Sequence, residues 1–211
     1  MTQPILYDYH RSSASFRVRI GLNLKGVEYE RRPVNLLENE QTSADYRGLN
    51  PQGLVPMLEI DGHRLTQSLA ILSYLDQRFC NQPLLPNVAE LRAHVLAMSL
   101  TVACDIHPLN NLRVLKYLSG ELAVEEEQRD RWYAHWIREG LPALEALAAP
   151  RSGAFLFGDG PTMADVCLVP QLYNARRYNV PVEDFPTLLR AEANANKLEA
   201  FAAAHPDRQQ V

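Results

Sequence analysis

The chain has 211 residues, of which 46% are hydrophobic and 22% charged, and its formal net charge at pH 7 is −4. That length is sufficient for the buried core of one large domain or two small ones. The acidic balance argues against a nucleic-acid-binding protein, and no apolar run approaches the roughly 18 residues that a membrane-spanning helix requires. The N-terminus lacks the basic and apolar segments of a signal peptide, so we expect a cytoplasmic protein.

The three cysteines, Cys80, Cys104 and Cys167, are widely spaced. No pair has metal-ligand spacing and their number is odd, so we expect neither a metal site nor a disulfide framework. Each cysteine is expected to be a small, buried, apolar residue. A thiol used by this protein would then arrive with a cofactor.

The first part of the chain alternates between strand-like and helix-like segments. A short apolar strand precedes a helix in which Phe16, Ile20 and Leu24 recur every four residues. Ser12 and Ser13 both stand where the N-cap of that helix belongs. The segments that follow are a strand at 27–34, a weakly helical stretch at 38–48, a strand at 55–60, a turn at 61–62, a strand at 63–65 and a helix from 68. This order is that of a thioredoxin-like α/β fold with a mixed sheet.

Composition divides the chain into two predicted domains. We expect an α/β domain at residues 1–81, a proline-containing linker at 82–88 and an all-helical domain at 89–211. The tail from His205 is expected to be loose.

The predicted helical domain contains two long periodic stretches. The first, 91–118, is broken near Pro108, where we expect a kink or a helix boundary. The second is 121–149. Its predicted core residues are Trp132, Trp136, Leu141, Leu144 and Leu147.

Thr162 and Asp165 have the spacing of a helix capping box, with Asp in place of the usual Glu. A capping box starts a helix. We therefore assign Asp165 to folding and not to catalysis.

Residues 12–20 read Ser-Ser-Ala-Ser-Phe-Arg-Val-Arg-Ile and resemble the zeta-class glutathione transferase signature, Ser-Ser-Cys-x-Trp-Arg-Val-Arg-Ile. Ala14 replaces the family's cysteine and Phe16 replaces its tryptophan. The resemblance extends from about residue 4 to residue 206. It implies the glutathione transferase fold, in which a thioredoxin-like domain is followed by an all-α domain, and glutathione as the cofactor.

The resemblance implies that Ser12 donates a hydrogen bond to the glutathione thiolate, with Ser13 as the second candidate and Ala14 beside them. A helix N-terminus can hold such an anion, although plain capping of an ordinary helix is the alternative. The same resemblance gives Pro56 a cis peptide bond and gives the backbone of Val55 a contact with the cysteinyl part of glutathione.

Two further segments match the family. Gln67 and Ser68 are expected to bind the γ-glutamyl end of glutathione, the alternative being that Ser68 is only a helix N-cap. By position, His107, Asn111 and Arg113 are expected to contact glutathione from the second domain.

Arginine is suited to binding carboxylates through two parallel hydrogen bonds. Arg11, Arg113, Arg176 and Arg177 are therefore candidates for the acid groups of a substrate, and Arg177 stands near the family's acceptor site. The alternative is that some of these side chains are solvated surface charges. Arg17 and Arg19 belong to the signature and are expected to serve packing.

The resemblance implies a glutathione-dependent isomerase that converts maleylacetoacetate or maleylpyruvate to the fumaryl product by reversible thiolate addition. One alternative is a glutathione S-transferase acting on α-haloacids, and another is a non-catalytic protein of the same fold. Because Ala14 is not a cysteine, a mechanism in this chain must use the thiol of glutathione. The family's usual state is a homodimer, and we expect no nucleic-acid or membrane partner.

Overall fold

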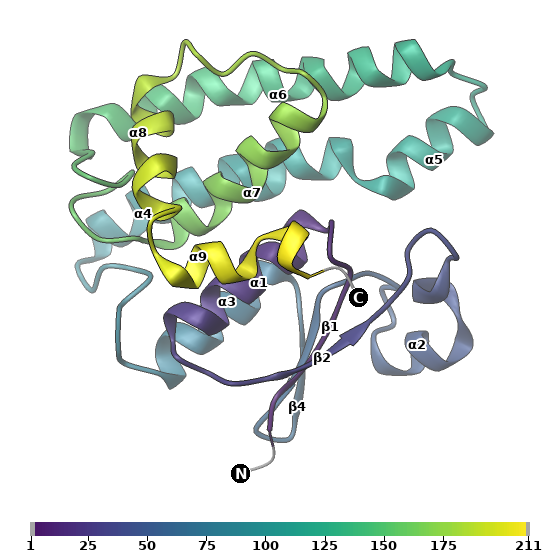
Figure 1. Ribbon diagram of the computed structural model, residues 1–211, viewed down its shortest axis with the longest axis horizontal. Helices are drawn as coiled ribbons and strands as arrows, with labels where there is room; N and C mark the ends of the chain where they lie inside the picture. The colour runs from purple at the N-terminus through teal and green to yellow at the C-terminus, as the bar shows by residue number, and fades with distance from the viewer. Residues whose placement is uncertain (1–2, 210–211) are drawn as a thin grey trace. The chain divides into compact units, whose positions relative to one another are not determined.

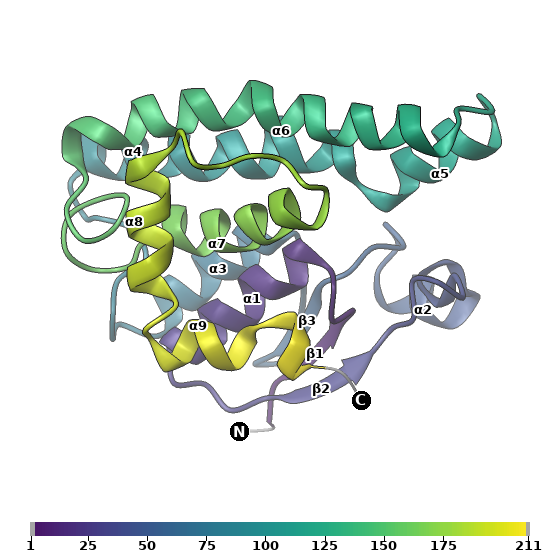
Figure 2. The same cartoon turned by 45° about the horizontal axis from the view of Figure 1, so that its top comes forward.

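The computed structural model describes residues 3–209, and it consists of two compact units (Figure 1). One unit contains the described residues up to Leu84 together with those from Lys197, and the other is Leu85–Asn196. The expected second domain, 89–211, therefore differs from the observed unit at its C-terminal end. The physical reason is a helix at Glu199–Ala204 that packs against the first helix of the chain (Figures 1 and 2).

A four-stranded mixed sheet forms the centre of the first unit, as the sequence predicted. The strands are β1 (Ile5–Asp8), β2 (Glu30–Pro33), β3 (Met57–Ile60) and β4 (His63–Thr66). Their order in the sheet is β2-β1-β3-β4; β1 pairs with β2 in parallel, whereas β3 is antiparallel to both of its neighbours. The two strands expected at 27–34 and 55–60 are shorter than predicted, because a turn at Gly26 and the bend before Met57 precede the pairing.

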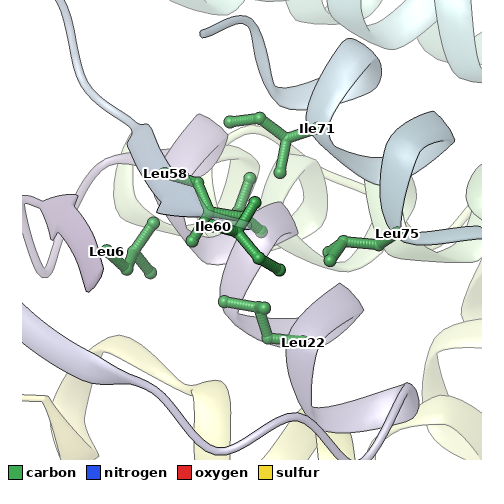
Figure 3. Close-up of a cluster of buried hydrophobic side chains, with 7 residues drawn as sticks. Leu6, Leu22, Leu58, Ile60, Ile71 and Leu75 are labelled. Atoms are coloured by element: carbon green, nitrogen blue, oxygen red, sulfur yellow. The ribbon is translucent and has the colours of Figure 1, made fainter. Parts of the chain in front are cut away.

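The helices of this unit are α1 (Ser13–Leu24), α2 (Ala44–Leu49), α3 (Ser68–Arg78) and α9 (Glu199–Ala204), with 3₁₀ turns at Glu40–Thr42 and Pro206–Arg208. Helices α1 and α3 pack against the sheet and enclose a core, whereas α9 packs against α1. Leucines and isoleucines of α1, α3, β1 and β3 meet in one buried cluster (Figure 3). Its members are Leu6, Val18, Leu22, Leu58, Ile60, Ile71 and Leu75. This cluster fixes α1 and α3 side by side on the sheet.

The close approach of α1 to α3 depends on Gly21. A Cβ atom added there would lie 2.2 Å from Cδ2 of Leu72, whose side chain is fully buried. We expect Gly21→Ala to lower the free energy of unfolding by about 1–3 kcal/mol, because the core must shift. The matched control is Gly48→Ala in α2, where no atom lies within 4 Å of the added Cβ and a small gain of about 0.5–1 kcal/mol is expected. Denaturant unfolding of both variants checks this, and equal effects would contradict it.

The C-terminal tail is ordered as far as it is described, so the expectation of a loose end from His205 was wrong. Pro206 is buried, and the ring of His205 meets the ring of Phe16 edge-on, with centroids 5.9 Å apart. The tail is held in place because these aromatic and apolar side chains are removed from water when they pack against α1.

The second unit is helical throughout. Its helices are α4 (Ala89–Leu100), α5 (Leu112–Gly120), α6 (Glu126–Ala148), α7 (Met163–Arg177) and α8 (Pro186–Ala195), with a π-helix at Thr101–Ile106 and 3₁₀ turns at His107–Asn110 and Ala149–Arg151. The boundary expected near Pro108 is confirmed, because the α-helical pattern stops at Leu100 and resumes at Leu112. None of the helices among residues 3–209 is both long and apolar enough to cross a membrane.

The buried face of α6 was predicted only in part. Leu141 and Leu144 are buried as expected, whereas Trp132, Trp136 and Leu147 are half-buried. The fully buried stripe consists of Tyr133, Ile137, Leu141, Leu144 and Ala148. These residues follow the mixed three- and four-residue spacing of one helix face, and both tryptophans flank that face.

The structure tests two further expectations, which are the capping box and the burial of the cysteines. The capping box is confirmed: the Thr162 N–H and Oγ1–H both donate to Oδ2 of Asp165, at 2.8 and 2.9 Å. Of the cysteines, Cys167 is buried as expected, but Cys80 and Cys104 are exposed because they stand at the solvent side of a helix end and a π-helix.

Candidate functional site

Strand pairing brings three of the predicted segments to one edge of the sheet. Tyr7 near the end of β1 pairs with Met57 at the start of β3, and Met57 pairs with Thr66 at the end of β4. The loop that leads to Ser12, the Val55–Pro56 bond and the start of α3 therefore share this edge. Residues more than 50 positions apart in the sequence thus contribute to one candidate site.

Ser12 is the N-cap of α1. Its backbone is extended (φ −70°, ψ 120°), and its Oγ accepts a hydrogen bond of 3.2 Å from the N–H of Ser15. A hydroxyl that accepts in this way keeps its own hydrogen to donate to another group. Ser13 is the first residue of the helix and is buried, and Ala14 follows it half-buried. The geometry favours Ser12 as the donor to an anion at the positive end of α1.

The Val55–Pro56 peptide bond is cis, as predicted. Val55 is half-buried and stands just before β3. Among residues 3–209, its N–H and C=O take part in none of the backbone–backbone hydrogen bonds of the turns and loops. These groups are open to an extended peptide-like ligand, which supplies both a donor and an acceptor.

The start of α3 is the third part of this sheet edge, and its backbone is unusual. Gln67 has φ 67° and ψ 113°, a strained conformation for a residue with a Cβ, costing about 1–3 kcal/mol. It offers no side-chain cap to the first turn of α3, and its Nε2–H donates to Oε1 of Gln52 at 3.1 Å. The alternative that Ser68 is only the N-cap is wrong, because Ser68 is already the first helical residue.

Arg17 is a member of this site that the sequence assigned to packing. Its buried guanidinium donates from Nη1 to Oγ of Ser68 at 3.2 Å, which links α1 to the start of α3. A buried cation beside a helix N-terminus strengthens the attraction for a carboxylate. The signature contained this residue, but its partner lies 51 positions away and only the fold reveals it.

The loop before α1 is electropositive. Burial, together with the charges of Arg11, Arg31 and Arg19, lowers the pKa of His10 below its usual value. The same positive charges favour a neighbouring anion. Arg11 itself is exposed on this loop, where a substrate carboxylate can reach it.

The second unit holds the other predicted contacts within one short stretch. His107 is half-buried and opens the 3₁₀ turn that follows the π-helix, a type of irregularity that is frequent at functional sites. Asn111 is the N-cap of α5, and its Oδ1 accepts from the N–H of Arg113 at 3.1 Å. Its amide nitrogen is thus the part suited to a ligand. The Arg113 side chain is exposed.

The two neighbouring arginines of α7 have different roles. Arg176 forms a two-pronged ion pair with Glu192 of α8, with both N–O distances 2.5 Å. Arg176 was a candidate for binding the acid groups of a substrate. The ion pair gives it a structural role instead. Arg177 is exposed, and its guanidinium lies over the rings of Tyr173 and Tyr178, 6.0 and 5.9 Å from their centroids. Arg177 remains the candidate for a substrate carboxylate.

Comparison with known families accounts for both units. Residues 3–77 match the family described as glutathione S-transferase, N-terminal domain, and residues 126–204 match glutathione S-transferase, C-terminal domain. The chain belongs to the glutathione S-transferase family.

Individual relatives indicate the class within this family. The maleylacetoacetate isomerase of Rhizobium meliloti is 48% identical, with 98% of this chain and 97% of the relative covered. The maleylpyruvate isomerase of a Ralstonia species is 42% identical, with 97% of each chain covered. A solved holo structure of a maleylpyruvate isomerase, described as a bacterial zeta-class glutathione S-transferase, superposes with a TM-score of 0.95 at 42% identity, over 97% of this chain and 98% of that one. Within its family, the chain is accordingly of the zeta class.

Proposed function

We propose that this protein is a glutathione-dependent cis–trans isomerase of maleyl-type diacids, acting on maleylacetoacetate or maleylpyruvate. The observation that carries the proposal is the sheet edge at which Ser12, the cis Val55–Pro56 bond and the Gln67–Ser68 pair meet. It occurs in a chain that is similar over its full length to relatives named for this reaction.

The residues at this edge fit glutathione, which is a peptide with a thiol and two free carboxylates. The backbone of Val55 suits its peptide groups, and the start of α3 with Ser68 and Arg17 suits a carboxylate. When bound, glutathione supplies a thiolate that adds reversibly to the substrate double bond and so permits rotation. Ser12 and the N-terminus of α1 lower the pKa of that thiol by stabilising its charged form.

The diacid is bound by arginines in this proposal. Arg11, Arg113 and Arg177 are each exposed, and a guanidinium group can bind a carboxylate through two parallel hydrogen bonds. We further propose His107 and Asn111 as glutathione-binding residues. We also propose a cytoplasmic homodimer, as is usual in the family, and sedimentation equilibrium measures its mass.

The experiment that tests the function is the conversion of maleylacetoacetate and of maleylpyruvate by the purified protein, with and without a catalytic amount of glutathione. We expect the fumaryl product with total thiol unchanged, and the relative kcat/KM values identify the preferred diacid. The alternative is a transferase of α-haloacids, for which Ala14 is no obstacle because the reacting thiol belongs to glutathione. Loss of thiol with chloroacetate, without isomerisation of either diacid, would support that alternative.

The pair of arginines in α7 offers a matched test of substrate binding. We expect Arg177→Ala to lower kcat/KM for the diacid about tenfold or more, chiefly through KM, because a charge-assisted hydrogen bond is lost. Arg176→Ala is the control: it should leave KM unchanged and lower the free energy of unfolding by about 1 kcal/mol, since its pair with Glu192 is partly exposed. Steady-state kinetics and denaturant unfolding separate the two. An Arg176→Ala variant with the larger KM would reverse the assignment.

A further inference from the structure

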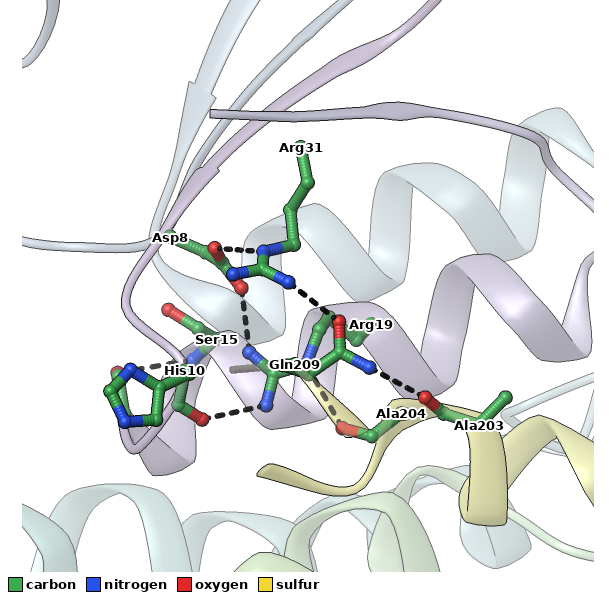
Figure 4. A network of polar contacts seen from close by, with 9 residues as sticks. Asp8, His10, Ser15, Arg19, Arg31, Ala203, Ala204 and Gln209 are labelled. Atoms are coloured by element: carbon green, nitrogen blue, oxygen red, sulfur yellow. Dashed lines mark hydrogen bonds and ion pairs between the residues drawn. The ribbon is translucent and has the colours of Figure 1, made fainter. Parts of the chain in front are cut away.

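The guanidinium of Arg19 joins three separate parts of the first unit (Figure 4). Arg19 and Asp8 are both fully buried, and Nη1 of Arg19 donates to Oδ2 of Asp8 at 2.6 Å. Nη2 donates to the backbone carbonyl of His10 at 2.9 Å, and Nε donates to that of Ala204 at 3.0 Å. One side chain of α1 thus holds the end of β1, the loop before α1 and the end of α9.

The C-terminal segment completes this network. The second oxygen of Asp8 accepts from Nε of Arg31 at 2.9 Å, and Nη1 of Arg31 donates to Oε1 of Gln209 at 3.1 Å. Gln209 in turn donates to the carbonyl of Ala203 at 2.6 Å (Figure 4). The single carboxylate of Asp8 therefore lies between two arginines, and it offsets the charge of Arg19 within the pair.

The network ends at the loop that presents Ser12. His10, whose carbonyl Arg19 holds, is two residues before Ser12, and the N–H of Ser12 donates to the carbonyl of Tyr9 at 2.9 Å. The Ser12 hydroxyl is fixed in turn by the N–H of Ser15. Because a long side chain on a helix extends toward the helix N-terminus, Arg19 reaches this loop from two turns further along α1.

We propose that Arg19 is a positioning residue for the isomerase reaction: by holding the His10 carbonyl, it places the Ser12 hydroxyl where a bound thiolate accepts its hydrogen. The inference rests on the proposed function. Arg19 touches neither glutathione nor the diacid in this role. A planar guanidinium can donate in three fixed directions at once, which the single nitrogen of lysine cannot reproduce.

The test is Arg19→Lys, which keeps the charge and removes the three-way geometry. We expect kcat to fall about tenfold with KM for glutathione within about twofold, because a small displacement of a catalytic donor is costly. The pKa of the bound glutathione thiol, titrated by the ultraviolet absorbance of its thiolate, should rise by about one pH unit. Hydrogen exchange of the Ser12 and Ser15 amides should become faster.

Lys25→Gln is the matched control. Lys25 is a further buried cation, at the C-cap of this helix, where its Nζ donates to Asp76 and to three backbone carbonyls. We expect it to lower stability without moving the thiol titration. If both variants lose stability and neither moves the titration, Arg19 is merely structural and the proposal is overturned.

Two further variants allow the proposal to be tested even if Arg19→Lys does not fold. Should Arg19→Lys fail to fold, Arg31→Lys replaces it: this side chain is 19% exposed, and loosening the other oxygen of Asp8 should move the thiol titration in the same direction by a smaller amount. An unchanged thiol titration in Arg31→Lys overturns the proposal.

Ser12→Ala separates the role of Arg19 from the proposed function. If Ser12→Ala raises the pKa of the bound thiol and the Arg variants do not, only the role of Arg19 fails. If Ser12→Ala leaves that pKa unchanged, the proposed role of Ser12 fails, and that of Arg19 with it.

Discussion

Ser12→Ala is expected to reduce kcat for diacid isomerisation about 10- to 100-fold. The reason is the loss of a hydrogen bond to a charged group, worth about 1.5–3 kcal/mol. The reaction should persist at a low level, because the positive end of α1 remains. Stopped-flow or steady-state absorbance of the diacid measures the effect, and KM for the diacid should change little.

The control for Ser12→Ala is Ser43→Ala. Ser43 caps α2 in the same manner, with extended backbone and its Oγ accepting from the N–H of Tyr46 at 3.2 Å. Both variants should lose about 1 kcal/mol of stability through the lost cap, but only Ser12→Ala should lose activity. A comparable loss of kcat in Ser13→Ala, with Ser12→Ala nearly unaffected, would transfer the role to Ser13.

The second large effect concerns stability and pH. Asp165 is fully buried at the start of α7, where its carboxyl accepts from the N–H groups of Leu156 and Thr162, each at 2.8 Å. Burial raises its pKa from 3.8 to about 6, against the opposing effect of these donors. The folded protein therefore binds this proton more tightly than the unfolded chain does.

The sign of the pH dependence follows from that difference. The contribution of Asp165 to stability is fully present below pH 3.8 and is lost as the pH rises to about 6. Relative to Asp165→Asn, the wild-type free energy of unfolding should fall by about 3 kcal/mol across this window. Asp159→Asn, which removes an exposed carboxylate from the loop before α7, is the control for the loss of one charge. A difference that instead grows with pH would mean that the donors hold Asp165 as an anion.

Asp165→Ala should be more severe than Asp165→Asn at every pH. It leaves two buried backbone N–H groups without an acceptor, each costing about 1–3 kcal/mol. Thermal unfolding of the two variants side by side measures the difference.

The features predicted correctly from the sequence are those that depend on a few neighbouring residues or on the signature. Ser12 as the cap of α1, the cis bond before Pro56 and the Thr162–Asp165 box are of this kind. The cap and the box each require only a backbone conformation and a side chain within three residues of it, whereas the cis bond was predicted from the family resemblance alone, since most X-Pro bonds are trans. The order of strands and helices could also be predicted, because hydrophobic periodicity is a local property.

The tertiary structure alone determined which residues bind one another through hydrogen bonds and ion pairs. No local pattern indicated that Arg19 binds the carbonyl of Ala204, 185 positions away, or that Arg17 binds Ser68. Nor did any pattern indicate that Glu192 forms an ion pair with Arg176. The contact between the C-terminal helix and α1, which places that helix in the first compact unit, was likewise not visible in the sequence. An arginine in a sequence has the same chemistry wherever it stands. Whether it holds a loop, a carboxylate of the chain or a ligand is determined by which acceptors the packed core brings within reach of its nitrogens.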